Sequence, residues 1–515
     1  MKQICKLSGT VLRYMILILA TFTTKVWAQN SSYSANTNSI AGTNCAAFGY
    51  QALSSNTVGG SGNTATGYQS LKNNSSGVAN TANGFQSLQS NNSGSQNTAI
   101  GTSALQNNTV GSDNCAHGYY SLVSNSSGSQ NTAIGSYSLF NNTSGFNNTA
   151  IGFSALNYNL NGYNNVATGY QALYNNSTGN SNTATGYESM YNNVNGFDNT
   201  SVGYQSLYSN STGAANTAIG LDALLNNYTG TNNTATGVSA LQNNNGVNNS
   251  AHGMYALFSN IFGQQNTSNG YASLYSNISG SYNTATGVGA LNSSTASFNT
   301  AHGAYSLYHN STGYSNSVNG YSALYSNSTG SSNTAIGDSA GYNSTGSKNV
   351  FLGNLAGFYE NSGSNKLYLA NDSNKTIMYG DFSTGQVLFG KANPAAYSFK
   401  GTRTVNVLGG IIGDSVRVAL PSGWSDFVFA DNYKLTPLED LDKFIRAYKH
   451  LPHIPSAEEV SRDGIDVASM DAKLLEKIEE LHLYILQQQK QIDLQEKNNL
   501  SLQKQIDELK EMITK

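Results

Sequence analysis

One 17-residue unit dominates the sequence and is repeated, with small variations, from Asn44 to Gly357. A clear copy starts at Asn182 and reads NTATGYESMYNNVNGFD. The fifth residue of each copy is a glycine, which we call the anchor glycine. The 19 anchor glycines are Gly49, Gly67, Gly84, Gly101, Gly118, Gly135, Gly152, Gly169, Gly186, Gly203, Gly220, Gly237, Gly253, Gly270, Gly287, Gly303, Gly320, Gly337 and Gly353. A fixed period of this length is typical of chains that stack one structural unit on the next.

Three other positions of the unit are nearly constant. An Asn stands four residues before the anchor glycine in every copy except the first, which has Cys45. A small residue stands two before it in nearly all copies, and a Leu four after it, replaced once by Met190 and by Gly341 and Gly357 in the last two copies. Offsets of two and four place side chains on one side of an extended chain. The sequence therefore predicts a mainly β fold, an elongated parallel β-solenoid or β-roll of about 19 repeats over residues 44–357.

Each unit is expected to be a strand, a bend, a short strand and a turn. The turns correspond to runs such as Asn175–Gly179, in which Gly and Asn tolerate positive φ. The Asn before each anchor glycine, such as Asn199, is expected to bond to the equivalent Asn of the units above and below. Asn210, in a turn, is expected to be exposed.

Two alternatives to this fold are weaker. Gly, Asn, Ser and Thr are poor helix formers. Polar low-complexity chains often stay unfolded, but the strict register of the Leu and the small residue argues for a folded array. All five prolines lie at Pro394 or later, so none interrupts a strand ladder within the repeats. Because the core is thin, either one chain forms a narrow solenoid or several chains share an apolar face.

The repeat also resembles known proteins. The motif Asn97-Thr-Ala-Ile-Gly101 resembles the head repeat of trimeric autotransporter adhesins. The longer copy that starts at Asn165 is similar to arrays in large surface and tail-fibre-like proteins of the Bacteroidetes type. The first resemblance implies β-rolls that associate in threes, and hence a parallel homotrimer.

The N-terminus has the pattern of a signal peptide over residues 1–28. A basic start precedes the short apolar stretch Tyr14–Phe22, and Val26-Trp27-Ala28 fits a cleavage site. These nine apolar-rich residues are too few to span a bilayer. No transmembrane helix is expected elsewhere in the chain either. Residues 29–43 would then form the N-terminal leader of an exported, cell-surface or extracellular protein.

A β-rich neck is expected over residues 358–430, where short apolar runs alternate with turn residues. The runs are Lys366–Ala370, Thr376–Tyr379, Gln386–Phe389, Val405–Gly409 and Ser415–Leu420. A small helical module is expected over residues 431–468, with a capping box at Thr436-Pro-Leu-Glu439 and another at Ser456–Glu459.

The last segment, residues 469–515, is predicted to be a coiled coil. With Ile478 at position a of a heptad, the period holds over more than five heptads, with Ile at a except Asn499 and Leu at d except Gln488 and Gln495. This choice of side chains by itself favours two strands, so the homotrimer rests on the resemblance of the repeats.

The segment from Trp424 to Leu475 resembles the C-terminal module of Bacteroidetes-type tail-fibre-like proteins. It is distantly similar to the intramolecular chaperone domain of phage tail spikes, which can cleave itself. In that family a Ser-Asp pair is followed by a basic stretch and a Lys. Here Ser425-Asp426 is followed by apolar residues and only later by Lys434, a departure that argues against self-cleavage.

No residues are proposed as catalytic, cofactor-binding or metal-binding, and no cofactor is expected. His117, His252 and His302 share one repeat position but are too far apart within a chain to bind one metal ion. Cys45 and Cys115 are four copies apart, too far for a disulfide. The net charge of −3 gives no electrostatic basis for binding nucleic acid.

The sequence therefore predicts an exported fibrous protein with a structural or adhesive role and no enzymatic activity. Its expected partners are copies of itself and a polysaccharide or cell-surface ligand. The repeated Tyr and Asn side chains either contact that ligand or only cover the surface of the solenoid. The alternative is a relative of phage tail fibres with a chaperone-like, self-cleaving C-terminal module.

Overall fold

The computed structural model describes residues 44–56, 59–392, 399, 404–419 and 424–514. The predicted signal peptide and N-terminal leader lie outside these residues. The chain divides between Gly409 and Gly410 into two compact units, which are described separately. The boundary lies inside the predicted neck.

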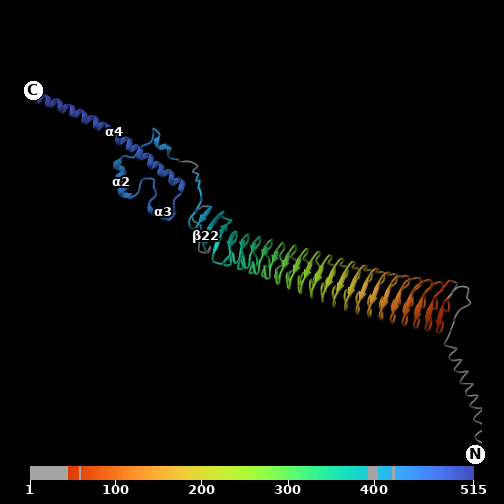
Figure 1. Cartoon of the computed structure of the whole chain (residues 1–515). Helices are drawn as coiled ribbons and strands as arrows, with labels where there is room; N and C mark the ends of the chain where they lie inside the picture. Colours follow the sequence, from red (N-terminus) through yellow and green to blue (C-terminus); the bar gives the residue numbers. More distant parts are fainter. Residues whose placement is uncertain (1–43, 57–58, 393–398, 400–403, 420–423, 515) are drawn as a thin grey trace, which may run out of the picture. The chain divides into compact units, whose positions relative to one another are not determined.

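The first unit is a parallel β-solenoid, confirming the predicted fold class (Figure 1). Each rung contributes one three-residue strand that pairs in parallel with the strands of the neighbouring rungs; for example, Thr200 lies opposite Thr217. The strands are β1 (Ala46–Phe48), β2 (Thr64–Thr66), β3 (Thr81–Asn83), β4 (Thr98–Ile100), β5 (Cys115–His117), β6 (Thr132–Ile134), β7 (Thr149–Ile151), β8 (Val166–Thr168), β9 (Thr183–Thr185), β10 (Thr200–Val202), β11 (Thr217–Ile219), β12 (Thr234–Thr236), β13 (Ser250–His252), β14 (Thr267–Asn269), β15 (Thr284–Thr286), β16 (Thr300–His302), β17 (Ser317–Asn319), β18 (Thr334–Ile336) and β19 (Val350–Leu352).

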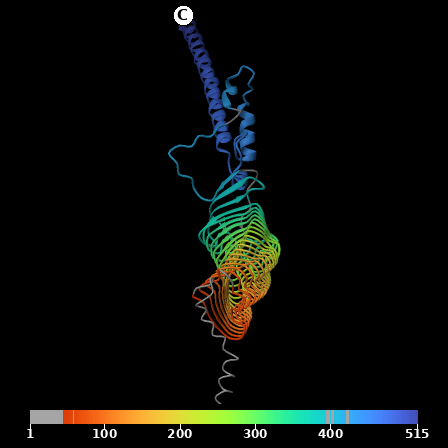
Figure 2. The same ribbon diagram turned by 90° about the vertical axis from the view of Figure 1, so that its right-hand side faces the viewer.

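The predicted second strand of each unit is not formed. In the rung of Gly203, both Gln205 and Leu207 have positive φ, at 49° and 51°. The left-handed conformation at alternate residues turns the chain sharply and prevents an extended strand. The segment still bonds to its neighbour, because the Leu207 N–H donates to the Ala223 carbonyl at 2.9 Å. Successive rungs therefore lie directly over one another (Figure 2).

The core of most rungs has one large apolar side chain and two small residues, which lie two before and three after the anchor glycine. The residue two before the anchor glycine, such as Ala218, and the Leu four after it, such as Leu207, are fully buried. One continuous cluster of such residues runs from Ala52 to Leu388. This narrow core leaves little room inside, so buried polar side chains must find partners within the stack.

The Asn four before each anchor glycine forms a buried column, which we call the inner ladder. Asn199 Nδ2 donates to Asn182 Oδ1 at 3.1 Å and to the Gly213 carbonyl at 2.9 Å. Asn199 Oδ1 accepts from the side chain and the backbone N–H of Asn216 at 3.1 and 3.0 Å. The predicted bonds between Asn side chains of adjacent rungs are confirmed.

A second column, which we call the turn ladder, was not expected. The Asn seven after the anchor glycine is also buried, and Asn210 Nδ2 donates to Asn193 Oδ1 at 2.7 Å. The prediction that Asn210 is an exposed turn residue is therefore wrong. Its amide also donates to the Gly213 carbonyl at 3.0 Å, so it closes the turn from inside.

The glycine three residues beyond each turn-ladder Asn is required by space, not by φ. Gly230 does not have positive φ, but a Cβ there would collide with Asn227 Oδ1 and lie 2.7 Å from the Gly246 carbonyl oxygen. In one rung this glycine is replaced by Ala296, and the ladder residue is the shorter Ser294. The replacement has a cost, because Asn277 Oδ1 in the rung before has no hydrogen-bond partner.

The three 16-residue units lose their residue at this turn. Asn244 and Gly246 are separated by one residue instead of two, yet Asn244 still donates to the Gly246 carbonyl at 3.1 Å. The deletion thus shortens the exposed tip of the turn and leaves the strand register in place. The turn ladder continues through Asn244, which bonds to Asn227 and Asn260, whereas the other two short units have Ser294 and Ser344 at this position.

The C-terminal end of the solenoid is closed by aromatic rings. Phe351 takes the place of the small residue two before the last anchor glycine and is fully buried. Its ring lies between Gly341 and Gly357; a Cβ on Gly341 would be 2.6 Å from it, and one on Gly357 would also collide. These two copies therefore lack the consensus Leu because the Phe351 ring fills its space.

The solenoid continues into the neck. β20 (Lys366–Ala370) pairs in parallel with β19, and β21 (Thr376–Asp381) and β22 (Gln386–Ala392) follow as antiparallel hairpins, as predicted. β23 (Val405–Val407) pairs in parallel with β22. The predicted strand Ser415–Leu420 is wrong, because residues 415–419 form no strand.

The second unit is helical. It contains the short 3-10 helix η2 (Ser425–Phe429) and the helices α2 (Leu438–Tyr448), α3 (Ala457–Asp463) and α4 (Val467–Thr514). The predicted capping box at Ser456 is confirmed, since Ser456 and Glu459 exchange both hydrogen bonds. The box predicted at Thr436 is not formed, because α2 has no side-chain cap. The Thr436 carbonyl instead accepts the Tyr484 hydroxyl at 2.5 Å.

Candidate functional site

One side of the solenoid, which we call the aromatic face, is formed by the residues one, two and five after each anchor glycine. Tyr255 contacts Phe258 of its own rung and Tyr271 of the next, with ring centroids 5.7 and 6.2 Å apart. Glutamines extend the same face, because Gln89 Nε2 donates to Gln69 Oε1 at 2.7 Å. The three positions therefore form one surface of tyrosine and amide side chains.

The tyrosines of this face stack on each other in two columns. The first has ring centroids 5.0–5.4 Å apart and contains Phe153, Tyr170, Tyr187 and Tyr204. The second has centroids 4.9 and 5.2 Å apart and contains Tyr174, Tyr191 and Tyr208. Each ring covers the face of the next, so the columns present hydroxyls and ring edges to solvent. Stacked aromatic side chains stabilise columns of parallel strands, and the exposed edges offer hydrogen bonds instead of ring faces.

The packing of the second column predicts alkaline destabilisation. Burial, reinforced by nearby ionisable side chains, raises the pKa of Tyr174, Tyr191 and Tyr208 above 10. A raised folded-state pKa stabilises the fold below the unfolded pKa of about 10, and this stability is lost as pH rises through the folded value. The melting temperature should therefore hold from pH 7 to about 9 and fall above about 10. The measurement is a series of thermal melts followed by circular dichroism.

The control for this prediction replaces Tyr174, Tyr191 and Tyr208 by Phe, which keeps the stack and removes the titrating hydroxyls. The triple variant should lose less stability between pH 9 and 11 than the parent. An equal loss in both would assign the alkaline transition to other groups.

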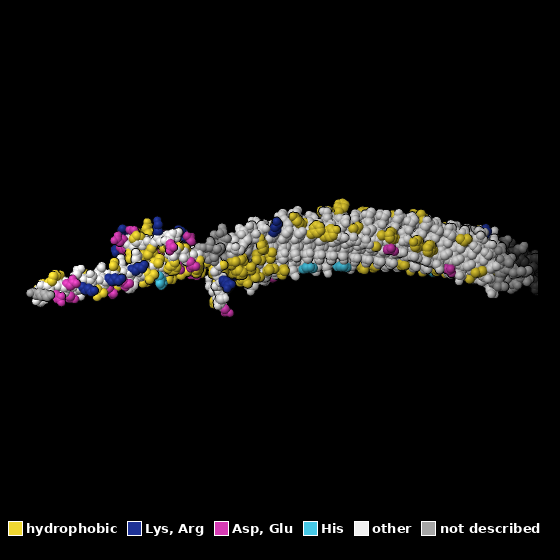
Figure 3. Space-filling model, turned by 90° about the horizontal axis from the view of Figure 1, so that it is seen from above, with side chains coloured by type: hydrophobic (Ala, Val, Ile, Leu, Met, Phe, Trp, Pro, Cys, Tyr) yellow, Lys and Arg dark blue, Asp and Glu magenta, His cyan; other side chains and the backbone are white. Residues whose placement is uncertain are grey.

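The outer side of the strands forms a second surface, which we call the sheet face. It carries the residues three and one before each anchor glycine, on either side of the buried small residue. Over β1–β19 these positions include no Lys, Arg, Asp or Glu. Apolar side chains are partly exposed there, including Ile219 at 42% and Val202 at 38%. The surface of the solenoid seen in Figure 3 is likewise nearly free of charge.

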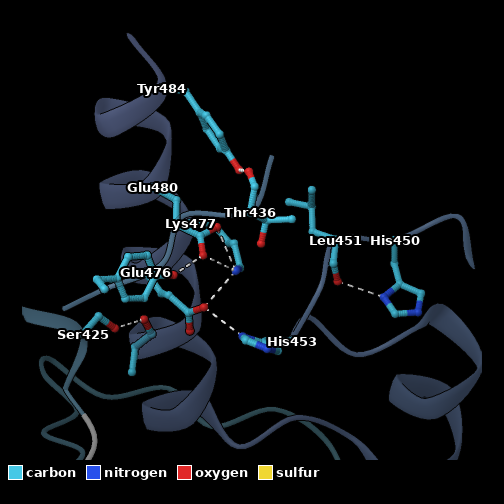
Figure 4. Close-up of polar contacts among 11 residues, drawn as sticks. Ser425, Thr436, His450, Leu451, His453, Glu476, Lys477, Glu480 and Tyr484 are labelled. Carbon is cyan, nitrogen blue, oxygen red and sulfur yellow. Dashed lines mark hydrogen bonds and ion pairs between the residues drawn. The ribbon is translucent and has the colours of Figure 1, made fainter. Parts of the chain in front are cut away.

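The second unit holds a compact network of charged groups on α4 (Figure 4). Lys477 Nζ lies 2.8 Å from Glu476 and 2.9 Å from Glu480, and its side chain is only 11% exposed. His453 contacts Glu476 at 2.9 Å, and the Tyr433 hydroxyl donates to Glu480. Although burial opposes it, bonding to Lys477 and His453 lowers the pKa of Glu476. These contacts fasten the segment before α4 to one side of that helix.

Ser425, the residue of interest for self-cleavage, is buried and donates its hydroxyl to the Ala472 carbonyl. This bond ties η2 to α4 and gives the side chain a structural role. A nucleophilic Ser needs an adjacent base, and the contact of this hydroxyl is a main-chain acceptor. The expected intact mass after folding is that of the uncleaved chain.

The apolar heptad positions of α4 are exposed within one chain. Ile478 and Ile485 at position a are both 52% exposed, and Leu481 and Leu502 at position d are 56% and 54% exposed. Helix α4 is as long as predicted. In the part of the chain that the structure describes, no helix has the length and apolar character needed to cross a membrane.

The motifs considered in the sequence lie on the solenoid surface. His117, His252 and His302 are exposed on three separate strands of the sheet face, and Cys45 and Cys115 are free thiols. Within the described residues of one chain, no three His, Cys, Asp or Glu side chains gather around one point. Sequence reasoning missed the turn ladder, although its Asn and the following Gly recur at fixed positions.

Comparison with known proteins adds no assignment. A scan against protein-family models found no matching family, and a search of curated proteins found no significant relative. A function can therefore be inferred only from the aromatic face, the sheet face and α4.

Proposed function

We propose that the chain is an exported fibrous protein with a structural and adhesive role at the cell surface. The observation that supports this most directly is the repetition of one surface over 19 rungs, held by two buried ladders. Equivalent positions recur about every 4.8 Å along the solenoid, and Tyr is common at those of the aromatic face. Such a surface suits many weak contacts, whose combined strength grows with their number.

The ligand class that this surface suits is a hydroxyl-rich polysaccharide or a glycosylated cell surface. The aromatic face offers tyrosine hydroxyls and Gln amides in columns, and it carries few charges. Neutral hydrogen-bonding groups match neutral sugars better than anionic or cationic polymers, which would need complementary charges.

The adhesive role can be tested by retention of the purified chain on a neutral glucan surface and on intact cells. Replacing Tyr170, Tyr187 and Tyr204 by Ser should lower retention several-fold, because three neighbouring hydroxyl-bearing edges are lost. The matched control replaces Thr183, Thr200 and Thr217 of the sheet face by Ser. Equal retention of the parent and the tyrosine variant would contradict the adhesive role of the aromatic face and favour a purely structural role.

Self-association is part of the proposal, as a parallel homotrimer joined along the sheet face and through a coiled coil of α4. The sheet face is about 90 Å long and about 10 Å wide, close to the roughly 800 Å² per partner of a standard interface. It bears no charge that would oppose burial. The exposed Ile and Leu side chains of α4 supply the apolar seam that a coiled coil requires.

This arrangement predicts that a charge on either surface weakens association. Ile219→Lys places an ammonium on the sheet face, and Leu481→Lys places one in the seam of α4. Burying an unpaired charge costs several kcal/mol, so each change should weaken association about a hundredfold or more. Light scattering over a dilution series measures the effect.

The matched control is Tyr204→Lys, at an aromatic-face residue that is 47% exposed, similar to Ile219. This variant should keep the mass of the parent at every concentration. A parent that scatters as a single chain would contradict the proposed assembly.

A further inference from the structure

Strand β5 differs from every other strand of the sheet face in the groups it exposes. Cys115 and His117 flank the buried Ala116, so both side chains lie on the outer side of the same strand. His117 is exposed and Cys115 is partly exposed. Alternate residues of a strand are about 7 Å apart, a spacing that two ligands of one metal ion can bridge. Their neighbours on the face are Thr98 and Ile100 on β4, and Thr132 and Ile134 on β6.

The chemistry of this pair fits zinc. Thiolate and imidazole are the usual ligands of structural zinc sites, which are four-coordinate and tetrahedral. Softer thiolate ligands also select zinc over magnesium and calcium. One chain supplies only two such ligands, and no third His, Cys, Asp or Glu joins them among the described residues. The pair is therefore half of a site.

We propose that Cys115 and His117 bind a zinc ion together with the same residues of neighbouring copies of the chain. This inference rests on the proposed self-association along the sheet face. In a parallel assembly in register, β5 of every copy lies at the same level. In the proposed homotrimer, three Cys115 and three His117 side chains lie at this level, more than the four ligands that a tetrahedral zinc ion takes. Each thiol that binds releases its proton to solvent, because the thiolate is the form that binds the metal.

Packed sheets lie about 10 Å apart, which places a central ion about 5 Å from each backbone. Cys and His side chains reach that far, with metal–ligand bonds of about 2.3 and 2.0 Å. An ion held in this way would lock the copies in register at one rung. Register is otherwise weakly specified on a face whose rungs are nearly identical.

The array contains its own control. His252 and His302 occupy the same position as His117, but Ser250 and Thr300 stand where β5 has Cys115. Ser250 Oγ lies 3.2 Å from His252 Nε2, so the serine already engages that ring nitrogen. These strands present the histidine without a thiolate.

The test uses the whole chain, purified without a polyhistidine tag, with Cys45→Ser as the starting variant so that Cys115 is the remaining thiol of the solenoid. Cobalt(II) replaces zinc as a visible probe, because thiolate ligation gives a charge-transfer band. We expect this band at one ion per three chains, and its displacement by zinc. Cys115→Ser should abolish the band and His117→Ala should weaken it, whereas His252→Ala should leave it unchanged.

Light scattering of the same samples distinguishes failure of the zinc site from failure of the self-association on which it depends. A multimeric chain without the band, or a band that survives in Cys115→Ser, would overturn the zinc site while leaving self-association intact. A single-chain mass would instead contradict the assembly on which the site depends. Unchanged scattering in Cys115→Ser, with the band lost, would show that the thiol binds metal and is not needed for folding.

Discussion

Replacing Asn199 by Leu should lower the stability of the solenoid by about 3–6 kcal/mol. The substitution removes two bonds donated by the Asn199 amide and two accepted by its oxygen. It leaves the buried Asn216 N–H without a partner, at a cost of about 1–3 kcal/mol, and it removes one of the two bonds of the Gly213 carbonyl and of the Asn oxygen one rung earlier, at about 1 kcal/mol each. Asn193→Leu should have a comparable effect, because it breaks the turn ladder at Asn176 and Asn210. Denaturant unfolding followed by circular dichroism measures the loss.

The rung of Asn193 contains the matched control. Asn195 is exposed at the tip of the turn, where its oxygen accepts a bond from the Thr178 hydroxyl at 2.7 Å. Asn195→Leu should change stability by no more than about 0.5 kcal/mol, as is usual for exposed sites. Equal unfolding midpoints for the three variants would mean that the buried columns do not hold the rungs together.

Removing the Phe351 ring should lower stability by about 3–5 kcal/mol, the usual cost of Phe→Ala in a core. The ring is fully buried between Gly341 and Gly357 and stacks on Tyr368 at a centroid distance of 5.5 Å. Phe351→Ala would leave a cavity, because the glycine on either side of the ring has no side chain to fill it. Unfolding of the C-terminal rungs can be followed by hydrogen exchange.

The compensating change tests whether ring and glycines form one packing unit. Adding Gly341→Leu and Gly357→Leu to Phe351→Ala restores the consensus of the earlier copies and should recover most of the lost stability. Gly341→Leu alone should destabilise, because its Cβ would meet the ring at 2.6 Å. Independent, additive effects of the three changes would contradict this account, because residues in contact are expected to couple.

Much of the solenoid could be predicted from its period. A residue that recurs every 17 positions occupies the same place in every rung, so the inner ladder, the buried Leu and the parallel register follow from spacing alone. The hairpins of the neck could also be predicted from the sequence, because apolar runs and turn residues alternate there over short distances. Ser415–Leu420 shows the limit of that pattern, since a suitable run forms no strand without a neighbouring edge to pair with.

The candidate surfaces were harder to predict from the sequence. The tyrosines were visible in the sequence as a repeated exposed residue, but their stacking was not. Stacking covers the ring faces and changes the chemistry that the surface can offer. Cys115 and His117 share one side of β5, but their spacing within one chain says nothing of the ligands that other copies would supply.

The sequence by itself determined the parallel stack, its number of rungs and the residues that fill the core, because periodicity alone specifies which side chains repeat in register. Tertiary structure decided what each Asn and Gly does. Asn210 and Asn195 are both turn residues, yet one is buried in a ladder and the other is exposed. Gly230 and Gly341 are both glycines for lack of space, one beside an Asn oxygen and the other beside an aromatic ring. Such differences depend on contacts between rungs, which arise only when the chain has coiled back over itself.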